Sequence, residues 1–419
     1  MQRLRGRIKR YLEAQRKLPW LKAIPDPRKA RGKRFPWWQV LQTLMAGLLC
    51  GKTNLRGMER LAERLGRRIS DTQLSRLLGR IPKEQAVEVL RAQVHRAWRS
   101  KSLQTKGGFN QVAVDGKTTW VGKYEANAAC HRQRCEGSVR WKVHVMNGTL
   151  VSSAHAMLID QMAVPSKKGE SSSFPSFFSR LLQAYGKTTM LQVLSADAGI
   201  TNEANARLID QQGIAYVLAL KGNQPTLYLE AQRLLSGLTK PEAVSAWTSE
   251  RQGYAQRQLF RSSEIAGFHD WNHLRQVILV RKVLVHQHTG EEEVEDRYFL
   301  TNLPTGGATA EHLLEMVRNH WMIENGPHWT LDTQWLEDDC PLNARAIETV
   351  GILRAIAYNI LGLLRSKHLR SARNRARSWQ GIMELVLGTL LLARSSPPRR
   401  IPHARETPPR ARGTRRRNR

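Results

Sequence analysis

The chain has 419 residues, and its 67 Lys and Arg against 35 Asp and Glu give a formal net charge of +32 at pH 7. A chain of this length can bury a large core and form two or three structural units. The positive charge indicates a polyanionic partner, because neutralised phosphates release their counterions. No uninterrupted apolar run approaches the roughly 20 residues of a membrane span, so we expect no membrane association.

The four cysteines, Cys50, Cys130, Cys135 and Cys340, lack paired CxxC spacing. They read as free thiols of a reducing compartment. A metal site at Cys130 and Cys135 stays open as an alternative, although no second ligand pair has zinc spacing. The N-terminus is basic but lacks the apolar core of a signal peptide. These features predict a cytoplasmic protein.

Residues 1–105 are predicted to be helical, because apolar residues recur at helical spacing. The helical segments are 37–51, 55–66, 71–81 and 83–98. The pattern then changes to strands at 109–116 and within 139–159. The second segment contains Asn147–Gly148, a dipeptide typical of hairpin turns, and therefore predicts two strands joined there.

The middle of the chain alternates between helix and strand, which favours an α/β core. The predicted elements are a helix at 176–186, a strand at 190–197, a helix at 202–213 and a strand at 214–221. A β-rich insertion follows at about 245–304, with a hairpin turn at 288–290. Helical pattern returns from Glu311.

The predicted divisions run from a helical N-terminal unit to a basic tail. They are 1–105 (helical, DNA-binding), 106–345 (catalytic), 346–393 (C-terminal helices) and 394–419 (tail). The tail is rich in Arg and Pro and poor in apolar side chains, so it is predicted to be disordered.

Three acidic residues stand in distinctive contexts. Asp115 and Asp197 end apolar, strand-like runs, whereas Glu324 lies in an aromatic, helix-patterned segment. A carboxylate in such a run is expensive to bury unless its charge is compensated. Simpler interpretations are that Asp115 caps a turn and that Asp197 caps the next helix, although Asn202 suits that cap better.

The segments around these acids resemble DDE transposases of bacterial insertion sequences, specifically the H-repeat-associated branch. The matching motifs are DGK at 115–117, KGNQP at 221–225 and HWMIENGPHWTLD at 320–332. The resemblance covers roughly residues 18–365. It implies an α/β, RNase H-like catalytic core whose Asp115, Asp197 and Glu324 hold two Mg²⁺ ions, with Mn²⁺ as a substitute.

The resemblance also implies an activity and partners. The enzyme would hydrolyse a phosphodiester at each element end and join the 3′ hydroxyl to target DNA. We would expect a homo-oligomer on double-stranded DNA, associated with the bacterial nucleoid. Two alternatives stay open: a catalytically idle, transposase-derived DNA-binding protein, and an RNase H-like metal-dependent nuclease that cleaves without joining.

Predicted DNA contacts cluster near the three acids. They are Lys117, Lys221, Gln224, Arg318 and His320. In the insertion, Gln256 stands where the family carries an acid, while Arg257 keeps a cation. This departure favours the idle alternative.

The segment around Glu324 admits a second chemistry. His320, Glu324 and His328 follow i, i+4 spacing, as in a zinc hydrolase. Pro327 should break the helix and displace His328, which argues against that interpretation. Four later acids could be mistaken for the third ligand: Asp332, Glu337, Asp338 and Asp339.

Overall fold

The computed structural model describes residues 2–395, apart from 17–23, 30–32, 104, 106–107, 136–137, 166–168 and 340–341. The predicted disordered tail therefore lies outside the described residues, except that the last helix continues to Ser395.

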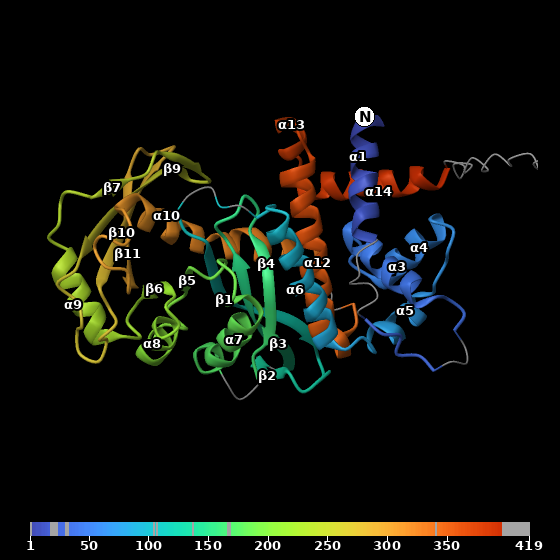
Figure 1. Cartoon of the computed structure of the whole chain (residues 1–419), viewed down its shortest axis with the longest axis horizontal. Coiled ribbons are helices and arrows are strands. Elements are labelled where there is room, and N and C mark those ends of the chain that lie inside the picture. Colours follow the sequence, from blue (N-terminus) through green and yellow to red (C-terminus); the bar gives the residue numbers. More distant parts are fainter. Residues whose placement is uncertain are drawn as a thin grey trace, which may run out of the picture.

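Within the described residues, one mixed sheet of eleven strands runs through the molecule (Figure 1). Its strands are β1 (Gln111–Gly122), β2 (Cys130–Cys135), β3 (Ser138–Leu150), β4 (Met157–Ala163), β5 (Val193–Ala196), β6 (Ala215–Leu220), β7 (Ala243–Val244), β8 (Thr248–Glu250), β9 (Gly253–Ser262), β10 (Gln276–His286) and β11 (Glu292–Thr301). The order is β2-β3-β1-β5-β6-β11-β10-β9-β7, with β4 beside β3 and β8 beside β9.

The central strands combine two kinds of pairing. β1, β3 and β4 form an antiparallel meander, whereas β5 and β6 run parallel to β1. β11 pairs antiparallel with β6, so the predicted β-rich insertion extends the same sheet. The predicted hairpin at 288–290 is confirmed, since β10 and β11 pair from Val285–Glu292 onward and Gly290 has φ +72°.

The helices lie around this sheet and beyond one end of it (Figure 1). They are α1 (Gln2–Arg16), α3 (Trp37–Leu49), α4 (Leu55–Arg64), α5 (Asp71–Leu78), α6 (Lys83–Arg99), α7 (Glu170–Tyr185), α8 (Glu203–Asp210), α9 (Pro225–Leu235), α10 (Ala310–His320), α11 (Trp329–Trp335), α12 (Ile347–Leu363), α13 (Ala372–Arg375) and α14 (Trp379–Ser395). The predicted N-terminal helices are thus present, and Asn202 caps α8 by accepting from Asn205 N–H.

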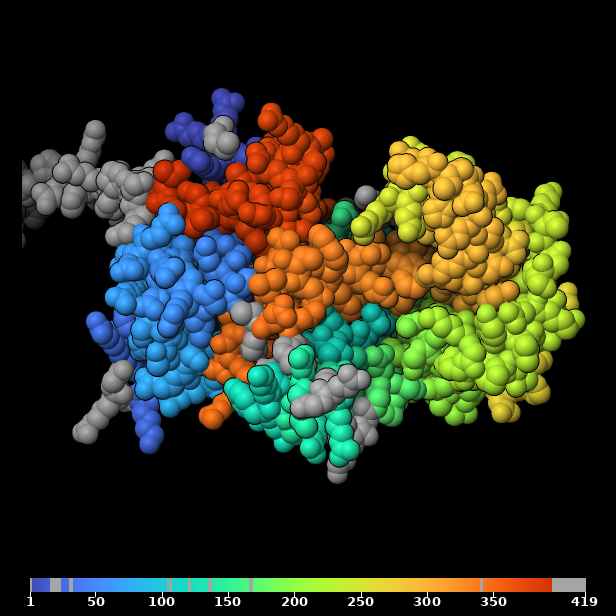
Figure 2. All heavy atoms as spheres, turned by 180° about the vertical axis from the view of Figure 1, so that it is seen from behind, coloured from blue at the N-terminus to red at the C-terminus, as the bar shows by residue number. Residues whose placement is uncertain are grey.

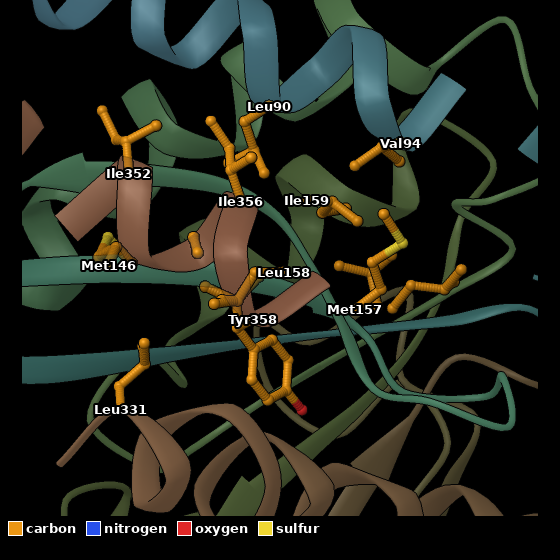
Figure 3. Close-up of a cluster of buried hydrophobic side chains, with 14 of the residues drawn as sticks. Leu90, Val94, Met146, Met157, Leu158, Ile159, Leu331, Ile352, Ile356 and Tyr358 are labelled. Carbon is orange, nitrogen blue, oxygen red and sulfur yellow. The ribbon is translucent and has the colours of Figure 1, made fainter. Parts of the chain in front are cut away.

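Helices from both ends of the chain pack together. α12 contacts α3, α6 and β4, and α14 contacts α1 and α3. Figure 3 shows Leu90 and Val94 of α6 facing Ile352 and Ile356 of α12 above the strands. Buried aliphatic area of this kind contributes roughly 25 cal/mol per Å². α12 therefore joins the N-terminal helices to the sheet.

The helical stretch Ala344–His368 is long and apolar enough to cross a membrane by length and composition. Its most apolar window is 94% buried inside the protein, as in a core helix.

The prediction of a hairpin at Asn147–Gly148 is wrong. β3 runs straight through both residues, and its reversal into β4 follows Leu150. A Cβ on Gly148 would lie 3.2 Å from Leu181 Cδ2 of α7. Asn147 is completely buried and bonded to side chains of other elements. Tertiary packing, rather than turn geometry, therefore explains this Asn-Gly pair.

We predict that Gly148→Val destabilises the protein by about 1–3 kcal/mol, because the added methyl groups overpack the contact with α7. Urea unfolding of the full chain would measure the change. Gly237→Ala is the matched control, since a Cβ there meets no atom within 4 Å. Equal stabilities of the two variants would contradict the packing explanation.

Candidate active site

Strand register brings Asp115 and Asp197 side by side. β1 and β5 are parallel neighbours, and their last registered pair is Val114 with Ala196. The next residue along the chain is in each case one of the two acids, Asp115 within β1 and Asp197 directly after β5. Adjacent strands lie about 4.8 Å apart, and α/β folds place functional groups where parallel strands end. The two carboxylates therefore lie next to each other where the parallel pairing of β1 and β5 ends.

Buried polar contacts attach α10 to the same strands. Gln111 Nε2 donates to Met316 O of α10 (2.8 Å) and to Ser195 Oγ of β5 (2.9 Å). Ser195 Oγ also lies 3.1 Å from His320 Nδ1. One residue before Glu324, the fully buried Ile323 packs in a small apolar cluster that includes Ala113 of β1. These contacts hold Glu324 near the two aspartates.

The three carboxylates interact electrostatically. Burial, together with the negative charges of Glu324, Glu170 and Asp197, raises the pKa of Asp115 to about 7. Burial and the charge of Asp197 raise the pKa of Glu324, against the opposing charges of Arg297 and Lys221. Like charges disfavour ionisation of each other. The fold therefore concentrates negative charge where these acids meet.

Glu170 is a fourth acid that the sequence did not reveal. It begins α7, and its Oε1 lies so close to β1 that a Cβ on Gly116 would approach it to 2.0 Å. A Cβ on Gly199 would lie 3.6 Å from Oε2. His144 Nε2 is 2.6 Å from Glu170 Oε1. The glycines that follow both aspartates were the available signal, because they leave room for this side chain.

The donor set suits a hard divalent cation. Carboxylate oxygens are the preferred protein ligands of Mg²⁺, which keeps several waters, and a cation would relieve the repulsion that raises the pKa of Asp115. Within the described residues, no group of three or more His, Cys, Asp or Glu side chains is already arranged to hold a metal. The carboxylates thus lie near one another without forming a closed ligand set.

Pro327 interrupts the α-helix, as predicted, but the chain stays helical across it. Glu324–His328 form one π-helical turn, and α11 begins directly afterwards. Proline clashes with the carbonyl four residues back in an α-helix, and the wider π-turn relieves that clash. His328 is consequently buried, with Nδ1 3.6 Å from Asp115 Oδ2.

The two histidines of the zinc alternative have protein partners. His320 lies beside Ser195, whereas His328 Nε2 lies 2.9 Å from Asn147 Nδ2. Burial, Lys117 and His320 together lower the pKa of His328 to about 3. Both rings therefore contact buried polar side chains inside the protein and do not form a zinc site together.

His320 does not fit a contact with DNA phosphate. It is only 3% exposed. Burial lowers its pKa to about 4, despite the charge of Asp197, so the ring is neutral at pH 7. It fixes α10 to β5 instead.

Lys117 does not fit the predicted phosphate contact either. Its side chain is 6% exposed, and its ammonium pairs with Asp332, Glu337 (3.1 Å) and Asp338 (3.1 Å). Glu337 also lies 3.8 Å from the fully buried Arg354 of α12. Three of the four acids that could be confused with Glu324 thus face Lys117.

Lys221, Gln224 and Arg318 lie at the surface around the site. Lys221 is 64% exposed, with Nζ 3.7 Å from Asp197 Oδ1. Gln224 occupies the N-cap position of α9, and its Nε2 donates to Thr201 O (3.4 Å) in the loop after Asp197. Arg318 is an exposed residue of α10. These positions are compatible with phosphate contacts.

A groove of about 660 Å³ leads to Glu324 between the insertion and the end of α10. Its cationic lining residues are Arg251, Arg257, Lys282, Arg297 and Arg318. Arg297 stacks over Trp321 at 4.4 Å from the ring centre. Figure 2 shows the orange segment that carries Glu324 meeting the gold strands of the insertion. The sequence did not single out Arg251, Lys282 or Arg297, because only strand pairing brings them together.

Comparison with known proteins identifies the family of this chain. The profile of the transposase DDE domain matches residues 107–360. The chain belongs to this family. Among curated proteins it is similar to the H repeat-associated putative transposase YhhI and the putative protein YbfL, both of Escherichia coli K12, each 29% identical over 262 residues. These alignments cover 60% of this chain and 63% of each relative.

The chain thus spans less than two thirds of the length of these relatives. Among solved structures it resembles one described as a piggyBac transposase synaptic complex with hairpin DNA. The TM-score is 0.47 at 10% identity, covering 91% of this chain and 80% of the other. At this level of similarity we infer nothing further from it.

We predict that Asp115→Asn changes how the stability of the metal-free protein depends on pH. The pKa of Asp115 rises from 3.8 to about 7 on folding. The folded state then binds more protons between these values, so the wild type loses stability as pH rises through that window. The variant should gain up to about 4 kcal/mol over the wild type at pH 8. Near pH 4 the gain should vanish.

Urea unfolding across pH 4–8, in the presence of a chelator, would measure the difference between the two proteins. A difference that is the same at every pH would show that the Asp115 carboxyl is not perturbed by folding.

Proposed function

We propose that this protein is a DNA transposase that hydrolyses phosphodiesters at insertion-sequence ends and transfers the 3′ hydroxyl into target DNA. The observation that carries the proposal is the repulsive meeting of Asp115, Asp197 and Glu324 in a chain of the DDE family. A cluster of acids is a poor structural device, because like charges disfavour each other's ionisation. It is a suitable device for binding cations.

The strand order supports an RNase H-like core. The meander of β4, β3 and β1, followed by β5 and β6 parallel to β1, places two acids on adjacent central strands. The third acid, Glu324, lies in a helical turn that follows the insertion in the chain. Strand-borne Asp, strand-borne Asp and helix-borne Glu is the arrangement that this fold implies.

Asp115, Asp197 and Glu324 would hold two Mg²⁺ ions, with Mn²⁺ as a substitute. When bound, such ions activate the attacking oxygen and stabilise the leaving one. The remaining work belongs to the chain. Lys221 would draw a phosphate toward Asp197, and Arg318 with the other groove cations would hold the strand beside Glu324.

The partner would be double-stranded DNA, both element ends and target, bound by a homo-oligomer in the bacterial cytoplasm. The charge of +32 supports a polyanionic partner. Three of the groove cations beside Glu324 are exposed, namely Arg251, Arg297 and Arg318, and they indicate the side from which the DNA would approach. Because no joining step can be read from a carboxylate cluster, an assay must separate transposition from simple cleavage.

We predict that Asp115→Asn, Asp197→Asn and Glu324→Gln each abolish cleavage of DNA carrying the element's terminal inverted repeats. Each change removes a carboxylate from the proposed metal ligands while leaving the fold and the DNA contacts in place. Gel assays in Mg²⁺ would score cleavage and strand transfer separately. Glu315→Gln, an exposed acid of α10, is the matched control and should keep both activities.

Two results would overturn parts of the proposal. Activity in Glu324→Gln together with loss in Glu337→Gln would identify a different third ligand. Cleavage by the wild type without any strand transfer would indicate a nuclease.

We also predict that Lys221→Ala and Arg318→Ala weaken DNA binding and each lower the slope of log K against log salt by about 1, because each removes one phosphate contact. Fluorescence anisotropy at several salt concentrations would measure the slope. Arg233→Ala is the control, an exposed arginine of α9 that pairs with Glu230 outside the groove. An unchanged slope in both site variants would exclude these residues from the interface.

A further inference from the structure

A row of buried polar side chains crosses the sheet behind Asp115. Asp115 of β1 pairs in register with Asn147 of β3, and Asn147 pairs with Gln161 of β4. Paired residues of neighbouring strands point to the same face. Asn147 and Gln161 are 0% and 5% exposed, respectively. An apolar row would fill this space without desolvating two amides, so the polar row needs an explanation.

Hydrogen bonds give the row a direction. Gln161 Nε2 donates to Asn147 Oδ1 (3.0 Å), and Asn147 Nδ2 lies 2.9 Å from His328 Nε2. An amide nitrogen can only donate, so His328 Nε2 accepts and carries no hydrogen. A neutral imidazole then has its hydrogen on Nδ1. The row thereby selects one tautomer of His328.

This tautomer directs an N–H at the candidate metal ligand. His328 Nδ1 is 3.6 Å from Asp115 Oδ2, a polar contact longer than a hydrogen bond. The backbone N–H of Gly116 donates to Asp115 Oδ1 (2.8 Å). The opposite tautomer would turn a lone pair of the ring toward the carboxylate. Each oxygen of Asp115 therefore faces one N–H group.

The remote end of the row is also fixed. Gln161 Oε1 lies against α12, where a Cβ on Gly351 would approach it to 2.6 Å. The other end depends on the π-turn, because Pro327 and the turn Glu324–His328 bring His328 under Asp115. Glu324 and His328 thus begin and end the same π-turn.

We propose that Gln161, Asn147 and His328 are positioning residues that set the tautomer of His328 and thereby orient the Asp115 carboxylate for metal binding. The inference rests on the proposed function, since it takes Asp115 as a metal ligand. Partners behind metal ligands orient them, and their loss weakens metal affinity or activity roughly 10- to 100-fold. The row gives the Asn-Gly pair at 147–148 a role that its sequence did not suggest.

The tautomer can be read directly, without activity. ¹⁵N NMR of the full chain labelled at histidine, metal-free at pH 7.5, reports which ring nitrogen carries the hydrogen. The His328 signal is the one that disappears in His328→Asn. The expected result is a hydrogen on Nδ1 and none on Nε2. A hydrogen on Nε2, or on both nitrogens, would overturn the inference.

The effect on the metal site is tested with Mn²⁺, whose free concentration is measured by electron paramagnetic resonance. His328→Leu removes the N–H and should weaken Mn²⁺ binding roughly 10- to 100-fold. The Asn side chain of His328→Asn is nearly isosteric with Leu, but it can place an amide N–H where Nδ1–H was. His328→Asn should therefore keep most of the wild-type affinity for Mn²⁺. Equal affinity in the wild type and the Leu variant, or equal losses in both variants, would refute the role.

Gln161→Leu tests the remote end without touching His328 and covers the case in which His328→Leu does not fold. It should weaken Mn²⁺ binding in the same direction. Gln93→Leu is the matched control, a buried amide between α6 and α12 that should leave the affinity unchanged. Unchanged Mn²⁺ affinity in Gln161→Leu would refute the positioning role of Gln161. A wild type that binds no Mn²⁺ would instead refute the proposed function.

Discussion

Mutual repulsion among clustered carboxylates is the constraint around which this fold is arranged. Burial of Asp115, together with the charges of Glu324, Glu170 and Asp197, raises its pKa to about 7. Holding such groups together requires rigid elements, since each would otherwise turn toward water. The parallel pairing of β1 with β5 supplies two of the acids, and the anchoring of α10 supplies the third.

Much of the surrounding structure secures that arrangement. Gln111, Ser195 and His320 attach α10 to β1 and β5 through buried hydrogen bonds. On the other side, Lys117 attaches β1 to the segment after α11 through Glu337 and its neighbours. Buried ion pairs of this kind add little net stability, because desolvation offsets their attraction. Their contribution here is to fix the position of the strand that carries Asp115.

The sequence could predict whether each acid lies near a strand or in a helix, because secondary structure depends on the local pattern of residues. Period-two apolar runs located Asp197 directly after a strand, and helical spacing located Glu324 in a helical segment. Asp115 was predicted at a strand end but lies within β1, which continues to Gly122 because it pairs with β3. The resemblance of the same segments to a family was confirmed by the match over residues 107–360. By contrast, the hairpin at Asn147–Gly148 was a local rule overruled by contacts from other elements, and the chain accommodates Pro327 in a π-turn.

The sequence by itself determined the alternation of strands and helices, the positive charge and the three acidic segments, because all of these follow from residue type and spacing. Only the tertiary structure decided which basic residues face solvent. It buried Lys117 and His320, left Lys221 and Arg318 exposed, and introduced Glu170. Neighbours across a sheet are separated by many residues along the chain. Strand register and helix packing, which no local pattern encodes, therefore decided the composition of the site.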